Sequence, residues 1–122
     1  MMNQSITTVI PNYNGDALLR KNLPSVIAAI NRYGYQSSLI IVDDGSKDGS
    51  LEMLNQEFPD IKVIAHEKNI GFAEAVHTGV KAATTDLVFI LNSDVQLTED
   101  FFPPLVSYFD NPNTFSVNPL IY

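Results

Sequence analysis

The sequence predicts one α/β domain of three layers, α/β/α, in which helices cover both faces of a mostly parallel β-sheet. Short runs of β-favouring apolar residues alternate along the 122 residues with segments whose apolar side chains recur at helical spacing. Two of the runs, residues 39–42 and 87–91, end directly in turn residues that include carboxylates. Alternating strands and helices favour parallel pairing through right-handed crossovers.

The first half of the chain supplies two strands and a helix. Residues 6–10 form the first predicted strand, which we expect Pro11 and the following turn residues to end. Residues 18–33 are predicted to be helical because five apolar side chains share one face. These are Leu19, Leu23, Val26, Ile27 and Ile30. Pro24 interrupts this pattern, so we expect a kink or a later start of the helix. Residues 39–43 form the second strand.

Residues 50–58 are predicted as the second helix and residues 61–65 as the third strand. The helix predicted over residues 72–83 has the clearest apolar stripe in the chain, at positions i, i+3, i+4, i+7, i+8 and i+11. We expect this stripe to be buried. It comprises Phe72, Ala75, Val76, Gly79, Val80 and Ala83.

The last predicted elements follow the same alternation. Residues 87–91 form the fourth strand, and Asp100, Pro103 and Pro104 mark the start of a helix. Leu105, Val106 and Phe109 would form its inner face. A fifth strand is predicted to begin at residues 115–117.

The composition narrows the possible partners. With 7 basic and 14 acidic residues the formal net charge is −7, which argues against a nucleic acid or an anionic membrane surface as partner. The chain has no cysteine, so disulfides and thiolate metal sites are excluded. No apolar run approaches the ~20 residues that span a bilayer. We therefore predict a soluble domain without a transmembrane segment.

Carboxylates follow two of the predicted strands. Asp43 and Asp44 end the second strand, and Asp94 follows the fourth. In parallel sheets, ligands bind outside the carboxyl ends of the strands. Neighbouring strand residues point to opposite faces, so we expect only one of the pair to face a ligand. Asp44, nearer the loop, could accept hydrogen bonds from a base or a sugar, and Asp94 could bind Mg²⁺ or Mn²⁺. Ordinary solvated turns are the alternative at both places.

Two further features have a functional and a structural interpretation. Asn69 and Gly71 precede the helix predicted from residue 72, whose N-terminal amides could receive an anion. A simple helix cap is the alternative. His66 and His77 are the only histidines, and no metal-ligand spacing relates them, so we predict that neither is a ligand.

Four short segments occur in an order that resembles the amino-terminal half of the family-2 glycosyltransferases. They are VIPNYN at 9–14, VDDGSKDGS at 42–50, NIGFA at 69–73 and LNSDV at 91–95. The resemblance covers essentially the whole chain, and the segment 42–50 is its most specific part. It implies the Rossmann-like GT-A fold and inverting transfer of a sugar from a nucleotide-diphosphate donor.

The resemblance also assigns roles to individual residues of the nucleotide pocket. It implies that Pro11, Asn12 and Tyr13 line this pocket after the first strand. It further implies that Asp44 contacts the base of the donor, with Asp43 beside it.

The same resemblance implies a divalent cation, Mn²⁺ or Mg²⁺, that bridges the diphosphate. Asp94 would be the metal ligand of a DxD-type motif whose first acidic position is Asn92 in this chain, a second candidate ligand. Asn69, Gly71 and Ser93 complete the residues that we assign to the nucleotide-sugar site.

In the family, a carboxylate general base and the acceptor-binding residues come well after the DxD region. The resemblance therefore implies that they lie beyond Tyr122, and that residues 1–122 are the donor-binding part of a truncated domain. We expect this part alone to transfer no sugar and to form homo-oligomers through exposed apolar surface.

The implied partners are a UDP-, GDP- or dTDP-type sugar and a glycan or lipid-linked acceptor. The implied role is cell-surface polysaccharide synthesis in the cytoplasm or at the cytoplasmic face of a membrane.

Three other classes of protein are alternatives to this family. A receiver domain of two-component signalling needs its acidic pair after the first strand and a lysine after the fifth, whereas here the pair follows the second strand and no lysine lies beyond Lys81. A dinucleotide-binding oxidoreductase needs a G-x-G-x-x-G turn, which residues 11–15 lack. A non-catalytic nucleotide-sugar binder remains open beside the enzyme.

Overall fold

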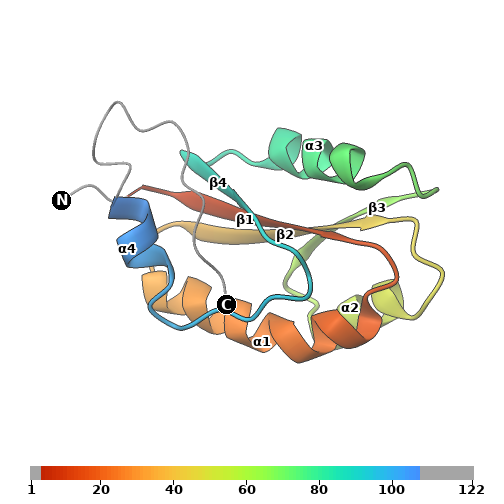
Figure 1. The fold of residues 1–122 in the computed structure, drawn as a ribbon, viewed down its shortest axis with the longest axis horizontal. Coiled ribbons are helices and arrows are strands. Elements are labelled where there is room, and N and C mark those ends of the chain that lie inside the picture. The colour runs from red at the N-terminus through yellow and green to blue at the C-terminus, as the bar shows by residue number, and fades with distance from the viewer. Residues whose placement is uncertain (1–3, 108–122) are drawn as a thin grey trace.

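The computed structural model describes residues 4–107, which form an α/β unit with helices on both faces of one sheet (Figure 1). Strands and helices alternate along the chain as predicted. The strands are β1 (Ile6–Asn12), β2 (Ser37–Asp44), β3 (Lys62–His66) and β4 (Leu87–Ile90). The helices are α1 (Asp16–Tyr33), α2 (Ser50–Glu57), α3 (Phe72–Ala82) and α4 (Phe102–Ser107).

The sheet has the strand order β3-β2-β1-β4, and every pairing is parallel. The predicted parallel sheet is therefore confirmed for the described part of the chain. Because all strands run the same way, their carboxyl ends lie at one edge. The register places Asn12 opposite Asp43 and Asp44 opposite His66 at that edge.

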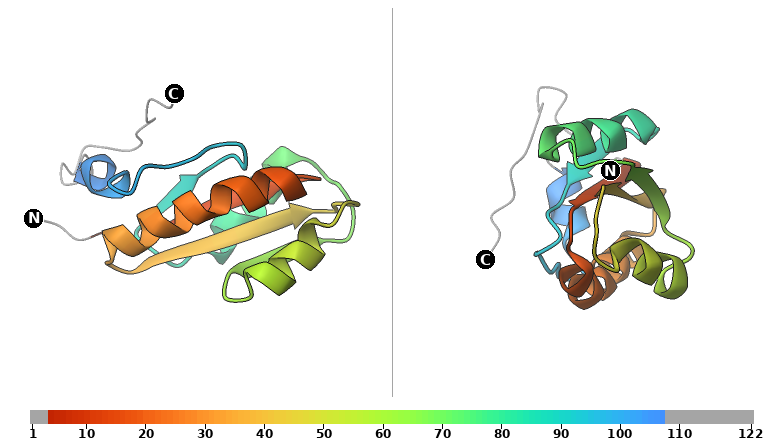
Figure 2. Two further views of the ribbon diagram at one scale, coloured as in Figure 1. Left: turned by 90° about the horizontal axis from the view of Figure 1, so that it is seen from below. Right: turned by 90° about the vertical axis from the view of Figure 1, so that its right-hand side faces the viewer.

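The two faces of the sheet are covered differently. Helices α1, α2 and α4 lie on one face, and α3 lies alone on the other (Figures 1 and 2). The larger apolar core is therefore on the α1 face, where Ile10, Leu23 and Phe102 are almost completely buried. The smaller core under α3 contains Val9, Val42 and Ala75. This arrangement confirms the three predicted layers.

Strand β1 continues through Pro11, where we had expected it to end. Strand β4 pairs only with residues 6–9 of β1, whereas β2 pairs as far as Asn12. Pro11 therefore lies where β1 has a neighbour on one side only, the position at which a strand best tolerates a missing N–H. The continuation carries Asn12 to the carboxyl edge.

Helix α1 begins at Asp16, two residues before the predicted start, and contains Pro24. The expected later start is therefore wrong. Pro24 is exposed, on the side of the helix away from the buried Leu19, Leu23 and Val26. The helix ends at Gly34, whose φ of 76° is left-handed and whose N–H donates to the carbonyl of Ile30.

The apolar stripe of α3 is only partly buried, contrary to our expectation. Ala75 and Gly79 are buried against the sheet, but Phe72 is 60% exposed and Val80 is 42% exposed. The reason is that α3 lies over β1 and β2, so that only its small residues face a strand. The width of a periodic stripe does not reveal how much sheet lies beneath it.

The remaining predicted elements agree with the structure to within about two residues. Phe109 and the predicted strand at residues 115–117 lie outside the described residues. Among the described residues, no helix is both long and apolar enough to cross a bilayer.

Candidate functional site

Four loops meet at the carboxyl edge of the sheet. They follow β1, β2, β3 and β4, and together with the last two residues of β1 and of β2 they contain every residue that the sequence predicted for a nucleotide-sugar site. Adjacent loops touch. Asn14 contacts Ser46 across the first two, and Gly45 lies against the backbone of Lys68 and Asn69 in the third. The site is therefore one continuous surface at the place where parallel sheets bind ligands.

Asp43 points to the α1 face and is fully buried. Its carboxylate accepts hydrogen bonds from Asn12 Nδ2 at 2.9 Å, from Ser46 N at 3.0 Å and from Ser46 Oγ at 2.7 Å. The aspartate thus fixes the turn after β2 and joins it to the end of β1. In this structure Asp43 is a buried support for the loop surface at the carboxyl edge.

Asp44 points to the opposite face, as the alternation of a strand requires. Its Oδ1 accepts from His66 Nδ1 at 2.8 Å and from Ile70 N at 3.0 Å. Its Oδ2 accepts from Asn69 Nδ2 at 3.1 Å and from Gly71 N at 2.9 Å. A carboxylate has about four acceptor positions, so all of them are occupied.

Burial and hydrogen bonding act on the pKa of Asp44 in opposite directions. Burial of this side chain, which is 3% exposed, would raise its pKa. The hydrogen bonds from His66, Ile70 and Gly71 outweigh that effect and hold the pKa below its ordinary value of 3.8. Asp44 is therefore an ionised anchor for the loop of residues 66–71.

This arrangement changes the interpretation of Asn69 and Gly71. The N–H groups of Ile70 and Gly71, just before α3, donate to the carboxylate of Asp44, and the receipt of an anion by the first amides of α3 itself stays a prediction. Asn69 does not cap the helix, since the N-cap position is Gly71 and no side chain caps it. Asn69 instead donates to both the carboxylate and the carbonyl of Asp44.

His66 belongs to this network, although the sequence singled it out only to exclude it as a metal ligand. Its Nδ1 contacts Asp44, and its Nε2 lies 2.8 Å from Thr78 Oγ1 on α3. The ring therefore joins β2, the end of β3 and α3. The only signal in the sequence was its position at a strand end, which does not reveal the cross-strand partner.

The loops after β1 and β2 are joined by hydrogen bonds from backbone N–H groups to side-chain oxygens. Asn14 Oδ1 accepts from Lys47 N at 2.8 Å, and Asp48 accepts from Asp16 N at 3.1 Å and from Ser50 N at 2.9 Å. Burial raises the pKa of Asp48, but the hydrogen bonds from Ser50 and Asp16 N lower it overall. The DGSKDGS segment thus serves as a rigid wall of the site.

Asn12 has one polar atom without a partner. The residue is 2% exposed, and its Nδ2 binds Asp43, but its Oδ1 has no hydrogen-bond partner among the described residues. Gly15 lies directly beside this oxygen, and Ser93 Oγ lies on the same side of Gly15. Asn12 and Ser93, which we predicted from separate segments, are therefore neighbours.

The surface of the site is formed by other side chains. Tyr13 is 49% exposed, and Pro11 is partly exposed beside it. Asn92 and Asp94 are both exposed after β4, with no hydrogen-bond partner among residues 4–107. These are the predicted site residues that a ligand can reach without displacing an internal contact.

The donor atoms of Asn92 and Asp94 are suited to a hard divalent cation. A carboxylate and an amide oxygen two residues apart can supply two oxygen ligands, and Mg²⁺ or Mn²⁺ takes the rest from phosphate and water. Within the described residues, no group of three or more acidic, histidine or cysteine side chains could hold a metal unaided. The residues therefore fit a cation that arrives with a phosphate ligand.

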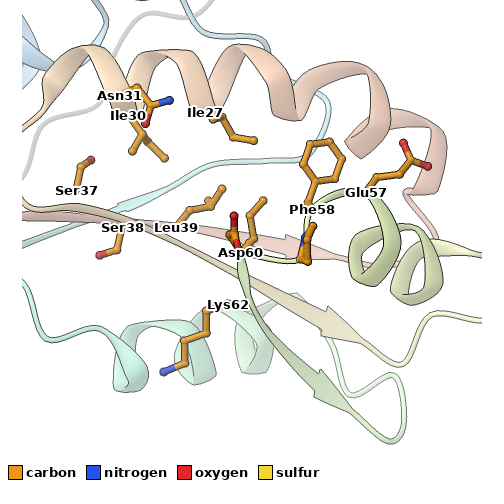
Figure 3. Close-up of a pocket in the computed structure, with 12 residues that line it drawn as sticks. Ile27, Ile30, Asn31, Ser37, Ser38, Leu39, Glu57, Phe58, Asp60 and Lys62 are labelled. Carbon is orange, nitrogen blue, oxygen red and sulfur yellow. The ribbon is translucent and has the colours of Figure 1, made fainter.

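A cavity of about 620 Å³ lies elsewhere, between α1, the start of β2 and the α2–β3 connection (Figure 3). It forms because β3 pairs with β2 only from Ile40 onward, which leaves residues 37–39 without a neighbour on that side. Ile27, Ile30 and Leu39 point into it. The cavity is at the amino-terminal half of the sheet, so it is separate from the candidate site.

Residues 7–122 match the model of the family described as glycosyl transferase family 2. The chain therefore belongs to this family, and the predicted resemblance is confirmed. Its curated relatives include two proteins named undecaprenyl-phosphate 4-deoxy-4-formamido-L-arabinose transferase. The one from Pectobacterium atrosepticum is 32% identical over 109 residues, which cover 86% of this chain and 33% of that protein. The one from Edwardsiella ictaluri is 35% identical over 111 residues, 88% of this chain and 34% of that protein.

Solved structures share the fold at lower identity. A mannosyltransferase from Pyrobaculum calidifontis in complex with GDP-Man and Mn²⁺ has a TM-score of 0.79 and 21% identity, covering 92% of this chain and 34% of that one. Residues 1–349 of S. aureus TarS in complex with UDP-GlcNAc have a TM-score of 0.74 and 20% identity, covering 87% and 31%. The chain thus spans about a third of the length of the curated relatives that it matches.

Proposed function

We propose that the carboxyl edge of the sheet binds a nucleoside-diphosphate sugar for an inverting glycosyltransferase. The observation that carries this proposal is the meeting of the four family segments at one edge, with their exposed members turned outward. UDP, GDP and dTDP sugars are the donor types proposed. A glycan or lipid-linked acceptor completes the reaction in the whole protein.

The chain's own residues divide into a supporting layer and a contact surface. Asp43, Asp44 and Asp48 hold the loops through internal hydrogen bonds. Pro11 and the exposed ring of Tyr13 offer an apolar and aromatic surface for a nucleoside, which can stack on such a ring.

The earlier assignment of Asp44 to the base of the donor stays a prediction. Because its four acceptor positions are filled, a ring N–H of the base would have to displace one of the donors from residues 66–71. We propose instead that Asp44 acts through this loop, whose exposed member Ile70 borders the nucleoside surface.

Asp94, with Asn92 as a second oxygen donor, would hold the divalent cation against the diphosphate. When bound, such a cation stabilises the negative charge that develops on the departing nucleoside diphosphate. The chain's own contribution is to place one carboxylate at the end of β4, on the exposed side of the loop.

The general base is proposed to lie outside the described residues. Of the carboxylates after Asp94, Asp100 forms an ion pair with Arg32 in the last turn of α1, with 3.1 Å between Oδ1 and Nε. Helix α1 runs from the carboxyl edge to the opposite edge of the sheet, so this pair is remote from the site (Figure 1). Asp100 therefore does not fit the deprotonation of an acceptor hydroxyl.

Titration of the ¹⁵N-labelled chain with UDP, GDP and dTDP should locate the site. The amide signals of Tyr13, Gly71 and Asp94 should shift because these residues lie on the proposed surface. Those of Asn31, Ser38 and Lys62 should stay in place, because they line the separate cavity. Shifts confined to the cavity, or no shifts at millimolar nucleotide, would contradict the proposed site.

A further inference from the structure

A polar residue occupies a core position of α1. Asn22 is 5% exposed, although it lies on the same helical face as Leu19, Leu23 and Val26, which form the main core. Burial of an amide among apolar side chains is unfavourable unless its hydrogen bonds are made. The position of Asn22 therefore depends on the group that its side chain binds.

That group belongs to the loop after β4. Asn22 Nδ2 donates to the carbonyl oxygen of Ser93 at 2.8 Å, and the two residues are 71 positions apart. One turn further along α1, Ser25 Oγ accepts from the N–H of Leu97 at 3.1 Å and donates to the carbonyl of Asn22 at 2.8 Å. Two side chains of α1, one turn apart, thus hold the loop at two points.

The held segment is the one that carries Asp94. The backbone N–H of Leu91 still donates to Val9 of β1, but residues 92–97 contain no helix or strand. The tethered carbonyl of Ser93 belongs to the peptide group whose N–H is that of Asp94, so the bond fixes the plane from which this carboxylate projects. Leu97, buried beneath the loop, fixes the other end.

We infer that Asn22 is a positioning residue for the metal ligand Asp94, with Ser25 as its partner. The inference rests on the proposed function. A ligand must be held to within ~0.5 Å of its productive place by the groups behind it, and Asn22 supplies this support from the core side of the loop. A polar residue at a core position of α1 is explained by this role.

Calorimetry tests the inference with Asn22→Leu, which keeps the branching and the number of side-chain heavy atoms but removes the donor. Titration of UDP and GDP at increasing Mn²⁺ should show half-saturation at about tenfold higher Mn²⁺ than in the parent, as for the loss of a group behind a metal ligand. Binding of the nucleotide without metal should not change. Ser25→Ala should shift the Mn²⁺ requirement in the same direction by a smaller factor. This variant replaces Asn22→Leu as the test if Asn22→Leu does not fold.

The matched control is Ile30→Ala, two turns further along the same helix at the separate cavity. It should lower the melting temperature but leave the Mn²⁺ requirement as in the parent. If Asn22→Leu and Ser25→Ala change only the melting temperature, as Ile30→Ala does, the role is structural and the inference is wrong.

Backbone ¹⁵N order parameters of the metal-free protein separate this inference from the proposed function. The order parameter of the Asp94 amide, which belongs to the peptide group that Asn22 holds, should be lower in Asn22→Leu than in the parent and in Ile30→Ala. If it is lower while the parent shows no effect of Mn²⁺ on nucleotide binding, the metal site is refuted and only the tether is supported. An unchanged order parameter in Asn22→Leu would overturn the tether.

Discussion

Replacement of Asp44 by asparagine should lower the free energy of unfolding by about 3 kcal/mol. The physical reason is the convergence of four donors on its carboxylate, from His66, Asn69, Ile70 and Gly71. An asparagine has one acceptor oxygen, and its NH₂ group would face donors. At least two donors would lose their acceptor around a side chain that is itself only 3% exposed. Urea denaturation of the two proteins at pH 7 measures the difference.

The same substitution should flatten the loss of stability in acid. The pKa of Asp44 is lower in the folded protein than its ordinary value of 3.8. The carboxylate therefore stabilises the fold in full above that value, and this contribution is lost as the pH falls below it. The urea midpoints of parent and Asp44→Asn should converge there. Asp60→Asn, an exposed change of the same charge, is the control, and equal midpoints for parent and Asp44→Asn at pH 7 would contradict the anchoring role.

Substitution of Gly45 by alanine should be comparably destabilising, by about 3 kcal/mol, through overpacking and a strained backbone together. Gly45 has a φ of +73°, and an added Cβ would lie 2.5 Å from the backbone atoms N of Asn69 and C of Lys68. A backbone neighbour cannot rotate away as a side chain can. The loops after β2 and β3 would have to separate, which should also weaken nucleotide binding.

Gly34→Ala separates the two causes. Gly34 has a similar φ of +76°, but the nearest atoms to its added Cβ are 3.8 Å away. In this variant the free energy of unfolding should fall only by the cost of placing alanine at a left-handed φ, about 1 kcal/mol. If the thermal unfolding of Gly45→Ala matches that of Gly34→Ala, the close contact between the two loops does not contribute to stability.

The sequence predicted the features that follow from local pattern. The alternation of strands and helices led to the parallel sheet, and the strand ends led to the expectation that Asp44 and Asp94 lie at one edge of it, as observed. Period-2 alternation also placed Asp43 and Asp44 on opposite faces, as observed. These predictions succeeded because one strand's geometry suffices to make them.

The features that the sequence did not reveal depend on partners distant in the chain. Asp44 looked available to a ligand, but the donors that fill it come from residues 66–71, whose approach depends on the pairing of β2 with β3. The sequence does not single out Asn22, because its partner Ser93 is 71 positions away. No periodic pattern of the sequence reveals contacts between residues that are so far apart in the chain.

The predicted burial of the apolar stripe of α3 was wrong for a related reason. Its width suggested a fully buried face, whereas Phe72 and Val80 remain exposed because α3 lies over β1 and β2. A helical pattern reports which side of a helix is apolar. It does not report how many strands lie beneath that side.

The most direct test of the central claim is the effect of Mn²⁺ on nucleotide binding in the parent and in Asp94→Ala. Calorimetry with UDP and GDP should show that Mn²⁺ tightens binding to the parent. In Asp94→Ala this gain should fall by more than about tenfold, since even a group behind a metal ligand costs that much. Asp100→Ala, which removes an exposed carboxylate paired with Arg32, should retain the gain. Full retention of the Mn²⁺ effect in Asp94→Ala would contradict the account.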